Sequence, residues 1–221
     1  MLALVGIALR GFRYPENSHA LDLQWELLCL AVALLGVGIR VVTVGHVPGG
    51  TSGRRTRSIG TDALNTTGLY SVVRHPLYLG NYLMWLGPAM VVRSWGIAVV
   101  VSLAFWLYYE RIMLAEEEFL RLRFGEQFEA WASNTPAFIP KHTGWRPWGL
   151  SFSLCTAVKR EASGLFALMS AFTAIEAGSD FAATGRIDFD PLWTVLFVTA
   201  ATIYLAVIAA RHTRLLHCHD R

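Results

Sequence analysis

Long apolar runs separated by short polar segments dominate this chain. The run from about Leu21 to Val44 is long enough to cross a bilayer, since a helix needs about 20 apolar residues to span ~30 Å of hydrocarbon. Its Glu26 and Arg40 lie near opposite ends, where long side chains can reach the membrane surface. Two further runs, 76–92 and 95–113, are separated by only two or three residues, and Pro76 suits a first helical turn. They predict a helical hairpin.

The remaining apolar runs are weaker. Residues 1–12 hold too few apolar positions for a full crossing, so they predict a short or truncated membrane helix. Two more helices are predicted at about 162–177 and 192–210, the second opened by Asp190 and Pro191. We therefore expect an all-α integral membrane protein, with a bundle of about five transmembrane helices within a range of about four to six.

The stretch that follows residue 113 is rich in charged residues, and its apolar residues recur at the spacing of a helix. These residues are Phe119, Leu120, Phe124 and Phe128. Apolar residues at this spacing among charged ones predict an amphipathic helix outside the hydrocarbon, continuous with the preceding membrane helix. We expect Gly125 to bend this helix, and the proline-containing segment 134–141 to end it.

Composition points to the same class. The chain of 221 residues is 54% hydrophobic and only 16% charged, which excludes an ordinary soluble domain. No linker or repeat divides it, so we expect one membrane-embedded domain over 1–221, with a motif-bearing core at 65–141 and additional membrane helices at 142–221. Lys and Arg concentrate before Pro76, in the amphipathic segment and in the C-terminal tail. By the positive-inside rule we expect these parts to face the cytoplasm.

Arg74 and His75 stand where a polar loop meets the apolar run at Pro76. Charged groups at the edge of a bilayer are costly unless something satisfies them. Because a hairpin is antiparallel, the acidic segment 110–118 on its second arm should lie at the same depth. Consecutive glutamates point about 100° apart around a helix, so only one or two face inward. An ordinary interfacial ion pair and a ligand site both remain open at this point.

The two motifs together resemble a known family. "GLYSVVRHPLYLGNYLMWLG", followed by a helix and then "EEEFLRLRFGEQFEAWASNTPAFIP", is similar to the signature of the integral-membrane methyltransferases typified by isoprenylcysteine carboxyl methyltransferase and the phospholipid methyltransferases. The resemblance covers residues 65–141. It implies S-adenosylmethionine (SAM) as methyl donor in a cytoplasm-facing pocket, with an acceptor that enters from the lipid. The three cysteines lie far apart in the chain and indicate no zinc site, so we expect no metal.

The resemblance also assigns residues. Arg74 and Glu117 are the expected catalytic pair, with Glu117 the preferred inward carboxylate. The expected cofactor-binding residues are His75, Tyr78, Gly80, Glu116 and Glu117. A glutamate can face the donor's ammonium or ribose, and a histidine its carboxylate. Tyr78 could instead anchor the helix at the membrane interface, and Gly80 could serve helix packing alone.

Arginines before the first motif bear on the acceptor. Arg54, Arg55 and Arg57 lie among Gly, Ser and Thr, and with Arg74 they suit a phosphorylated head group. The same loop also resembles a bacterial branch that includes lipid A phosphate methyltransferases. We therefore favour a lipid phosphate as acceptor, and otherwise the carboxylate of a prenylated or other lipidated group. Alternatively, these arginines serve only to orient the chain by the positive-inside rule and to attract anionic lipid.

Two other function classes remain open. A steroid-reductase-like membrane oxidoreductase that uses NADPH has a related Arg-His-Pro-x-Tyr helix, although its motif continues with an acidic residue where this chain has Asn81. A non-enzymatic lipid-binding or transport protein would keep the Arg loop without needing an acidic pair beside Arg74. One departure from the methyltransferase pattern is Phe128, which stands where the family has a tyrosine. Oligomeric state is not indicated, and no nucleic-acid partner is expected.

Overall fold

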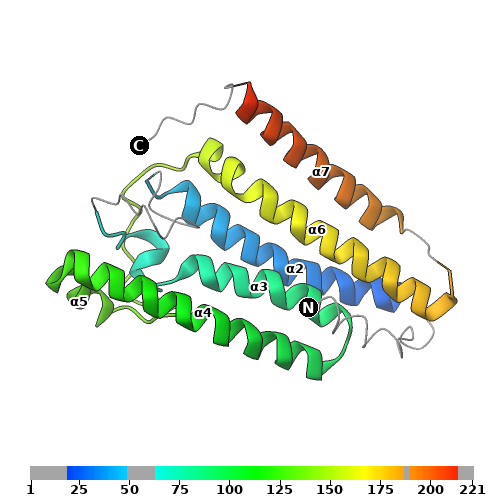
Figure 1. The fold of residues 1–221 in the computed structure, drawn as a ribbon, viewed down its shortest axis with the longest axis horizontal. Coiled ribbons are helices and arrows are strands. Elements are labelled where there is room, and N and C mark those ends of the chain that lie inside the picture. The colour runs from blue at the N-terminus through cyan, green and yellow to red at the C-terminus, as the bar shows by residue number, and fades with distance from the viewer. Residues whose placement is uncertain (1–18, 49–62, 187–189, 214–221) are drawn as a thin grey trace.

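The computed structural model describes residues 19–48, 63–186 and 190–213. Within these ranges it consists of α-helices and one 3₁₀ helix, without a strand (Figure 1). The elements are α2 (His19–Gly45), η2 (Gly68–Ser71), α3 (Pro76–Val91), α4 (Trp95–Phe124), α5 (Glu126–Ala132), α6 (Leu154–Thr184) and α7 (Pro191–His212). The expected helix at residues 1–12 lies outside the described residues.

Four of these helices are long and apolar enough to cross a membrane. They are α2 from Leu21, α4, α6 and α7. The expectation of an all-α integral membrane protein is confirmed. Helix α3 is shorter: its 16 residues extend about 24 Å, less than the ~30 Å of a bilayer core. Helices α6 and α7 are both longer than the periodicity predicts.

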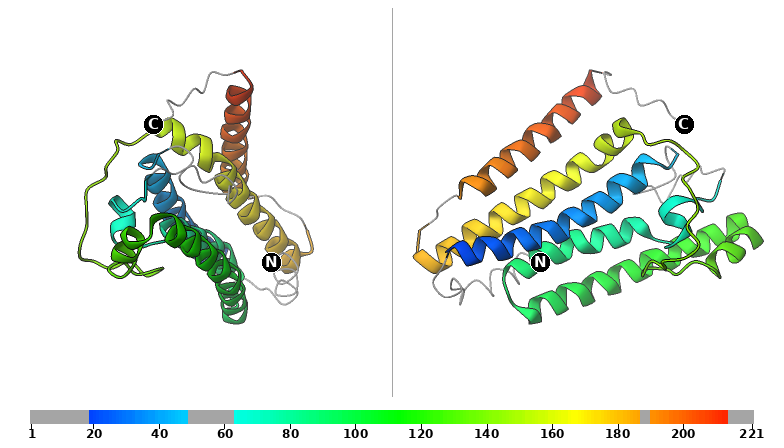
Figure 2. Two further views of the ribbon diagram at one scale, coloured as in Figure 1. Left: turned by 60° about the vertical axis from the view of Figure 1, so that its left-hand side comes forward. Right: turned by 180° about the vertical axis from the view of Figure 1, so that it is seen from behind.

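The long helices lie side by side in the order α7, α6, α2, α3 and α4, as Figures 1 and 2 show from three directions. The α2–α3 contact is the most extensive, followed by α6–α7 and α2–α6. It is close because glycines meet at it: a Cβ added to Gly36 would lie 2.5 Å from the Gly80 carbonyl oxygen. Small residues let membrane helices approach in this way. Helix α3 also touches α6 directly, although less extensively than it contacts α2.

The predicted hairpin is confirmed. Helix α3 begins at Pro76 and tolerates Pro88 near its end, and Val92, Arg93 and Ser94 connect it to α4. Arg93 adopts the left-handed conformation, with φ at 53°, which makes this tight connection possible. The hairpin brings the start of α3 beside the later turns of α4.

Helix α4 runs without interruption from the membrane arm into the charged segment, as expected. It ends at Gly125, whose φ of 51° and ψ of −125° suit glycine, and α5 follows directly. Phe128 of α5 is completely buried. The amphipathic segment is therefore two helices separated at one glycine.

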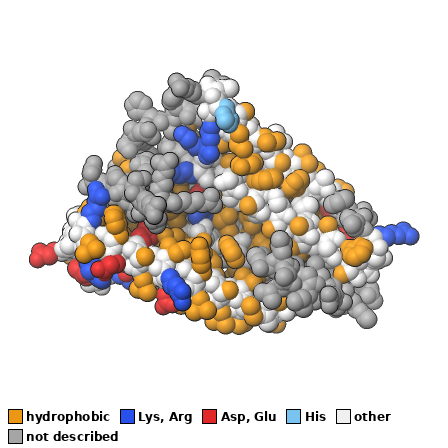
Figure 3. Space-filling view, viewed as in Figure 1, with side chains coloured by type: hydrophobic (Ala, Val, Ile, Leu, Met, Phe, Trp, Pro, Cys, Tyr) orange, Lys and Arg blue, Asp and Glu red, His pale blue; other side chains and the backbone are white. Residues whose placement is uncertain are grey.

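Apolar side chains cover the outside of the bundle. Leu103, Leu107 and Leu205 are each about 60% exposed, as lipid-facing residues would be. Figure 3 shows apolar side chains along this face and charged ones gathered at the end formed by α5 and the last turns of α4. Inside the bundle, Phe172 and Trp193 stack in parallel at 5.1 Å between centroids. The apolar exterior and the charged end fit a membrane bundle with one polar rim.

Two acidic or basic side chains depart from the expected arrangement. Glu26 and Arg40 were expected to extend toward the membrane surface, but both turn inward. Glu26 is 2% exposed and accepts from the Trp193 indole, and Arg40 pairs with Glu161 of α6. Each has a partner on another helix, which the pattern of apolar residues could not reveal.

Candidate functional site

The start of α3 is held in place by the proline-containing segment that follows α5. The backbone N–H of Arg74 donates to the Pro136 carbonyl at 2.8 Å, and that of His75 donates to the Ala137 carbonyl at 3.1 Å. Because His75 is the N-cap of α3, these bonds fix the direction in which both side chains leave the backbone. The proline-containing segment after α5 therefore helps to position Arg74 and His75.

A second layer of contacts supports the turn before α3. The Trp131 indole donates to the Tyr70 carbonyl at 2.9 Å, and the Gly68 N–H donates to the Arg146 carbonyl at 2.9 Å. Gly68 has φ at +58°, and a Cβ there would lie 1.9 Å from the Trp148 ring. Only glycine fits both the conformation and the contact.

Glu117 of α4 joins the two motifs. One of its carboxylate oxygens lies 2.8 Å from His75 Nε2 and 3.2 Å from Arg74 Nε. The hairpin brings these residues together because α4 returns to the depth at which α3 begins. The structure therefore places the two residues predicted as a catalytic pair, Arg74 and Glu117, in direct contact.

Glu116 occupies the other side of His75. Its Oε2 accepts from the Tyr78 hydroxyl at 2.8 Å and lies 3.6 Å from His75 Nδ1. The rings of His75 and Tyr78 stack 5.4 Å apart. Glu118, in contrast, points away and pairs with Arg121 at 2.8 Å. Of the three consecutive glutamates, two face the site and one faces solvent.

The surroundings of His75 favour its charged form. Burial by itself disfavours the imidazolium, but hydrogen bonds and charge from Glu116 and Glu117 outweigh it and raise the pKa of His75 above its ordinary value. Nearby, burial and the negative charge of Glu116 raise the pKa of Tyr70, which stays a neutral phenol. When His75 is protonated, the site therefore holds two cations, Arg74 and the imidazolium, beside Glu116 and Glu117.

The cluster is open on one side. The His75 side chain is 4% exposed, whereas that of Glu116 is 36% exposed. Arg74 Nε is buried and has no hydrogen-bond partner among the described residues, although it lies beside Glu117. A ligand could therefore reach Glu116 from outside while His75 stays enclosed.

A polar network continues from this cluster into the bundle. The Tyr78 ring contacts the Tyr109 ring, and the Tyr109 hydroxyl accepts from Asn81. Asn81 Oδ1 accepts from Arg40 Nη1 at 2.6 Å, and Arg40 also makes a bidentate pair with Glu161 at 2.7 and 2.8 Å. Sequence reasoning missed Arg40 and Glu161 as partners. An arginine and a glutamate within apolar runs were the available signal, but nothing in spacing showed that α2 and α6 are neighbours.

The remaining predicted site residues are Gly80 and the three arginines of the loop before α3. Gly80 lies against α2, where an added Cβ would be 2.6 Å from Arg40 Cγ, so its contact in the structure is helix packing. Its role in cofactor binding stays a prediction. Arg54, Arg55 and Arg57 lie outside the described residues, and their role toward an acceptor is likewise a prediction.

Part of this chain is similar in sequence to known proteins. The phospholipid methyltransferase family model matches residues 27–127, a little under half of the chain. A nickel-cobalt-cadmium resistance protein of Alcaligenes xylosoxydans xylosoxydans is 36% identical over 123 residues, which are 53% of this chain and 55% of that protein. A cobalt-zinc-cadmium resistance protein of Cupriavidus metallidurans is 37% identical over 121 residues, 54% of this chain and 52% of that protein.

A eukaryotic enzyme is also similar. The protein-S-isoprenylcysteine O-methyltransferase of Schizosaccharomyces pombe is 32% identical over 77 residues, 35% of this chain and 33% of the enzyme. The resemblance of the motif-bearing segment to membrane methyltransferases of the phospholipid and isoprenylcysteine types is confirmed. The chain spans about half the length of the two bacterial relatives that it matches. No solved structure matches it.

Proposed function

We propose that this chain is a SAM-dependent methyltransferase that methylates a lipid-type acceptor in the membrane. One observation carries the proposal: Arg74 and His75 at the start of α3 contact Glu117 of α4 at the polar rim of an apolar bundle. The similarity of residues 27–127 to phospholipid methyltransferases supports it. The remaining residues of the site suggest how each partner of the reaction is held.

The residues present fit this cofactor. SAM carries an ammonium, a carboxylate and a sulfonium, so its site needs both signs of charge and an aromatic face. Glu116 is the exposed carboxylate and would accept from the ammonium or the ribose hydroxyls. His75 would donate to the carboxylate through Nδ1, which lies 3.6 Å from Glu116, after the ligand takes the place of that contact. The stacked rings of Tyr78 and His75 lie beside them, and Tyr78 would face the sulfonium.

When bound, SAM supplies an electrophilic methyl group. Methyl transfer to an acceptor that is already an anion requires alignment rather than proton removal. Arg74 would orient such an acceptor, and Glu117 would hold the Arg74 guanidinium in position through its 3.2 Å contact.

The partners of Glu117 bear on the acceptor class. An amine acceptor would require a free base, but Glu117 Oε1 already faces donors from both His75 and Arg74. This favours an anionic acceptor, with a lipid phosphate first and a lipidated carboxylate second. Arg54, Arg55 and Arg57 would contribute to the phosphate site. The excess of Lys and Arg on this side of the hairpin supports a site that faces the cytoplasm, in a bacterial inner membrane.

Binding of the cofactor can be tested on the purified full chain in detergent by calorimetric titration with SAM. We expect Glu117→Gln to weaken binding about tenfold or more, as for loss of a charge-assisted hydrogen bond. Glu118→Gln is the matched control, because it removes the neighbouring carboxylate, which faces solvent. It should bind like the wild type.

Two other results would replace the proposal. Saturable NADPH binding without SAM binding would favour the reductase class, in which Asn81 would then be the departure to explain. Binding of neither cofactor by folded protein would favour a lipid carrier. Equal SAM affinity in all three proteins would show that the cofactor sits elsewhere.

The names of the bacterial relatives support a second, physiological proposal. Two are resistance proteins for divalent transition metals. We infer that methylation by this chain supports growth under cobalt, zinc or cadmium stress. A deletion strain should lose growth at raised metal concentration, and a plasmid with the wild-type gene should restore it. A plasmid carrying Glu117→Gln should not, and full rescue by that variant would separate metal resistance from methyl transfer.

A further inference from the structure

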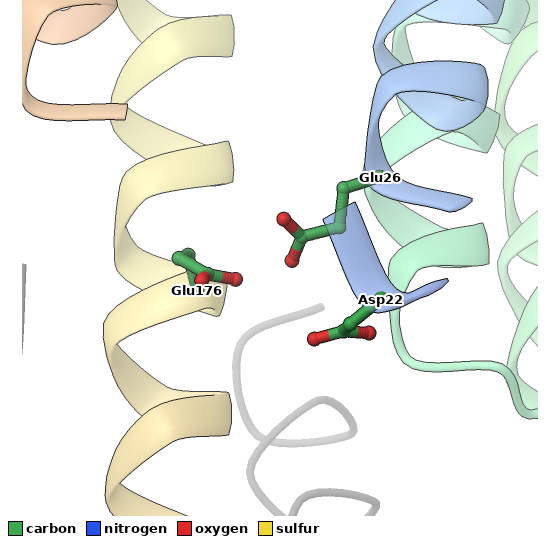
Figure 4. A group of neighbouring side chains, drawn as sticks. All are labelled: Asp22, Glu26 and Glu176. Carbon is green, nitrogen blue, oxygen red and sulfur yellow. The ribbon is translucent and has the colours of Figure 1, made fainter. Parts of the chain in front are cut away.

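Three carboxylates meet at the end of the bundle opposite the candidate site (Figure 4). Asp22 and Glu26 lie four residues apart on one face of α2, and Glu176 comes from α6. Each residue is 2% exposed. One oxygen from each lies within 4.8 Å of the others, and Figure 4 shows Glu176 and Glu26 pointing toward one another across the helix interface.

The neighbouring donors satisfy only part of this group. The Trp193 indole donates to Glu26 Oε2 at 2.9 Å, and Arg93 Nη2 lies 2.5 Å from Asp22 Oδ1. Glu176 Oε2 is buried and has no hydrogen-bond partner among the described residues. Within those residues, no Lys, Arg or His forms an ion pair with Glu26 or Glu176.

This arrangement is costly without another positive charge. A buried carboxylate is stable when it is paired, protonated or bound to a metal. A proton shared between Glu26 and Glu176 would join only two of the three carboxylates and would leave Asp22 outside that bond. A cation between the three carboxylates would engage all of them at once.

We propose that Asp22, Glu26 and Glu176 bind one divalent cation. Oxygen ligands stand about 2.0 to 2.6 Å from such ions, so two ligands of one ion are at most about 5 Å apart, and the 4.8 Å limit satisfies this. The donor set contains oxygen only, without histidine nitrogen or cysteine sulfur. This chemistry suits a hard ion of the Mn²⁺, Mg²⁺ or Ca²⁺ class, with water in the remaining positions.

The site is separate from the proposed methyl-transfer site. All three ligands lie outside residues 27–127, the part similar to phospholipid methyltransferases. Helices α2 and α6 supply them, and α7 contributes the Trp193 hydrogen bond. A bound ion would therefore tie the added helices α6 and α7 to α2.

Mn²⁺ alone is the probe for the test. The purified full chain in detergent is freed of metals with a chelator and titrated with Mn²⁺, whose free form is counted by electron paramagnetic resonance. We expect one bound Mn²⁺ per chain and a higher unfolding temperature when it is present. Glu26→Gln and Glu176→Gln should each weaken binding by more than about tenfold, since even loss of an outer-shell partner costs about 10- to 100-fold.

Glu126→Gln, which removes an exposed carboxylate of α5, is the control and should bind Mn²⁺ like the wild type. If a glutamine variant fails to fold, the wild-type titration and Asp22→Asn still decide the matter. Wild-type protein that neither retains Mn²⁺ nor gains thermal stability from it overturns the proposal and leaves a shared proton as the explanation. Binding that survives both glutamine substitutions also overturns it.

Discussion

His75 lies between two carboxylates at the start of α3. Its Nε2 contacts Glu117 and its Nδ1 faces Glu116, so both ring nitrogens can donate when the imidazole is protonated. A neutral imidazole could donate only once. The contact between α3 and α4 at this end of the hairpin therefore depends on the charge of one side chain.

This charge makes stability depend on pH. The pKa of His75 is raised in the folded protein, so its stabilising contribution is complete below the unfolded value of about 6.5 and is lost as pH rises through the folded value. We expect the unfolding temperature of the wild type to exceed that of His75→Gln most at about pH 6 and least at about pH 9. Thermal unfolding in detergent across this range checks it. A difference that grows with pH would mean that burial, rather than the two glutamates, controls the titration.

The orientation of the three consecutive glutamates, 116–118, could be predicted in part from the sequence. Helical geometry predicted that only one or two of three consecutive glutamates face inward, and family resemblance selected Glu117. The structure agrees, with Glu118 turned to solvent. That Glu116 accepts from Tyr78 could not be predicted, because it depends on the rotation of α4 relative to α3.

Helices α2 and α3 approach through glycines. At Gly36 an added Cβ would meet backbone atoms of α3, whereas at Gly38, two residues later on the same helix, it would meet nothing within 4 Å. Backbone cannot rotate away from a clash as a side chain can. The distance between the two helices is thus fixed by a few positions without side chains.

We predict opposite effects for alanine at these two glycines. Gly36→Ala should destabilise the protein by about 1 to 3 kcal/mol, as overpacking does. Gly38→Ala should leave stability unchanged or raise it by up to about 1 kcal/mol, because alanine favours helix. Urea or thermal unfolding of both variants tests this. Equal stability of the two would show that α2 and α3 can separate without cost.

The ion pair of Arg40 and Glu161 connects α2 to α6. Breaking a buried pair from one side costs about 3 to 5 kcal/mol, and the lower end applies here because the Arg40 side chain is 20% exposed. Glu161→Gln should therefore lower stability by about 3 kcal/mol. Arg40→Leu combined with Glu161→Leu should recover most of that loss in the same unfolding assay. A double variant as unstable as the sum of the single ones would exclude coupling between them.

The helices themselves could be predicted well from periodicity, but their neighbours could not. The hairpin followed from its short connection, and the break at Gly125 from one residue. The α2–α6 pairing joins segments 121 residues apart, so no local pattern reveals it. For this reason Arg40 and Glu26 were assigned to the membrane surface when both are held inside by partners on distant helices.

Among the described residues, clusters of charged side chains lie toward both ends of the bundle. One lies at the α4–α5 end, where charged side chains gather, and combines cations with carboxylates (Figure 3). The other lies at the opposite end and is dominated by carboxylates. The first uses the segment shared with membrane methyltransferases, and the second uses residues outside it. The bundle thus carries one polar cluster within the segment similar to phospholipid methyltransferases and one carboxylate group formed by residues outside that segment.

The most direct measurement is transfer of a radiolabelled methyl group from SAM into the lipid fraction of bacterial membranes that contain the protein. We predict labelled lipid with the wild type and with Glu118→Gln, and about 100-fold less with Glu117→Gln, since misplaced reactants alone can cost about that factor. Absence of label with folded wild-type protein, or equal label with Glu117→Gln, would contradict the assignment of methyl transfer to the Arg74–His75–Glu117 cluster.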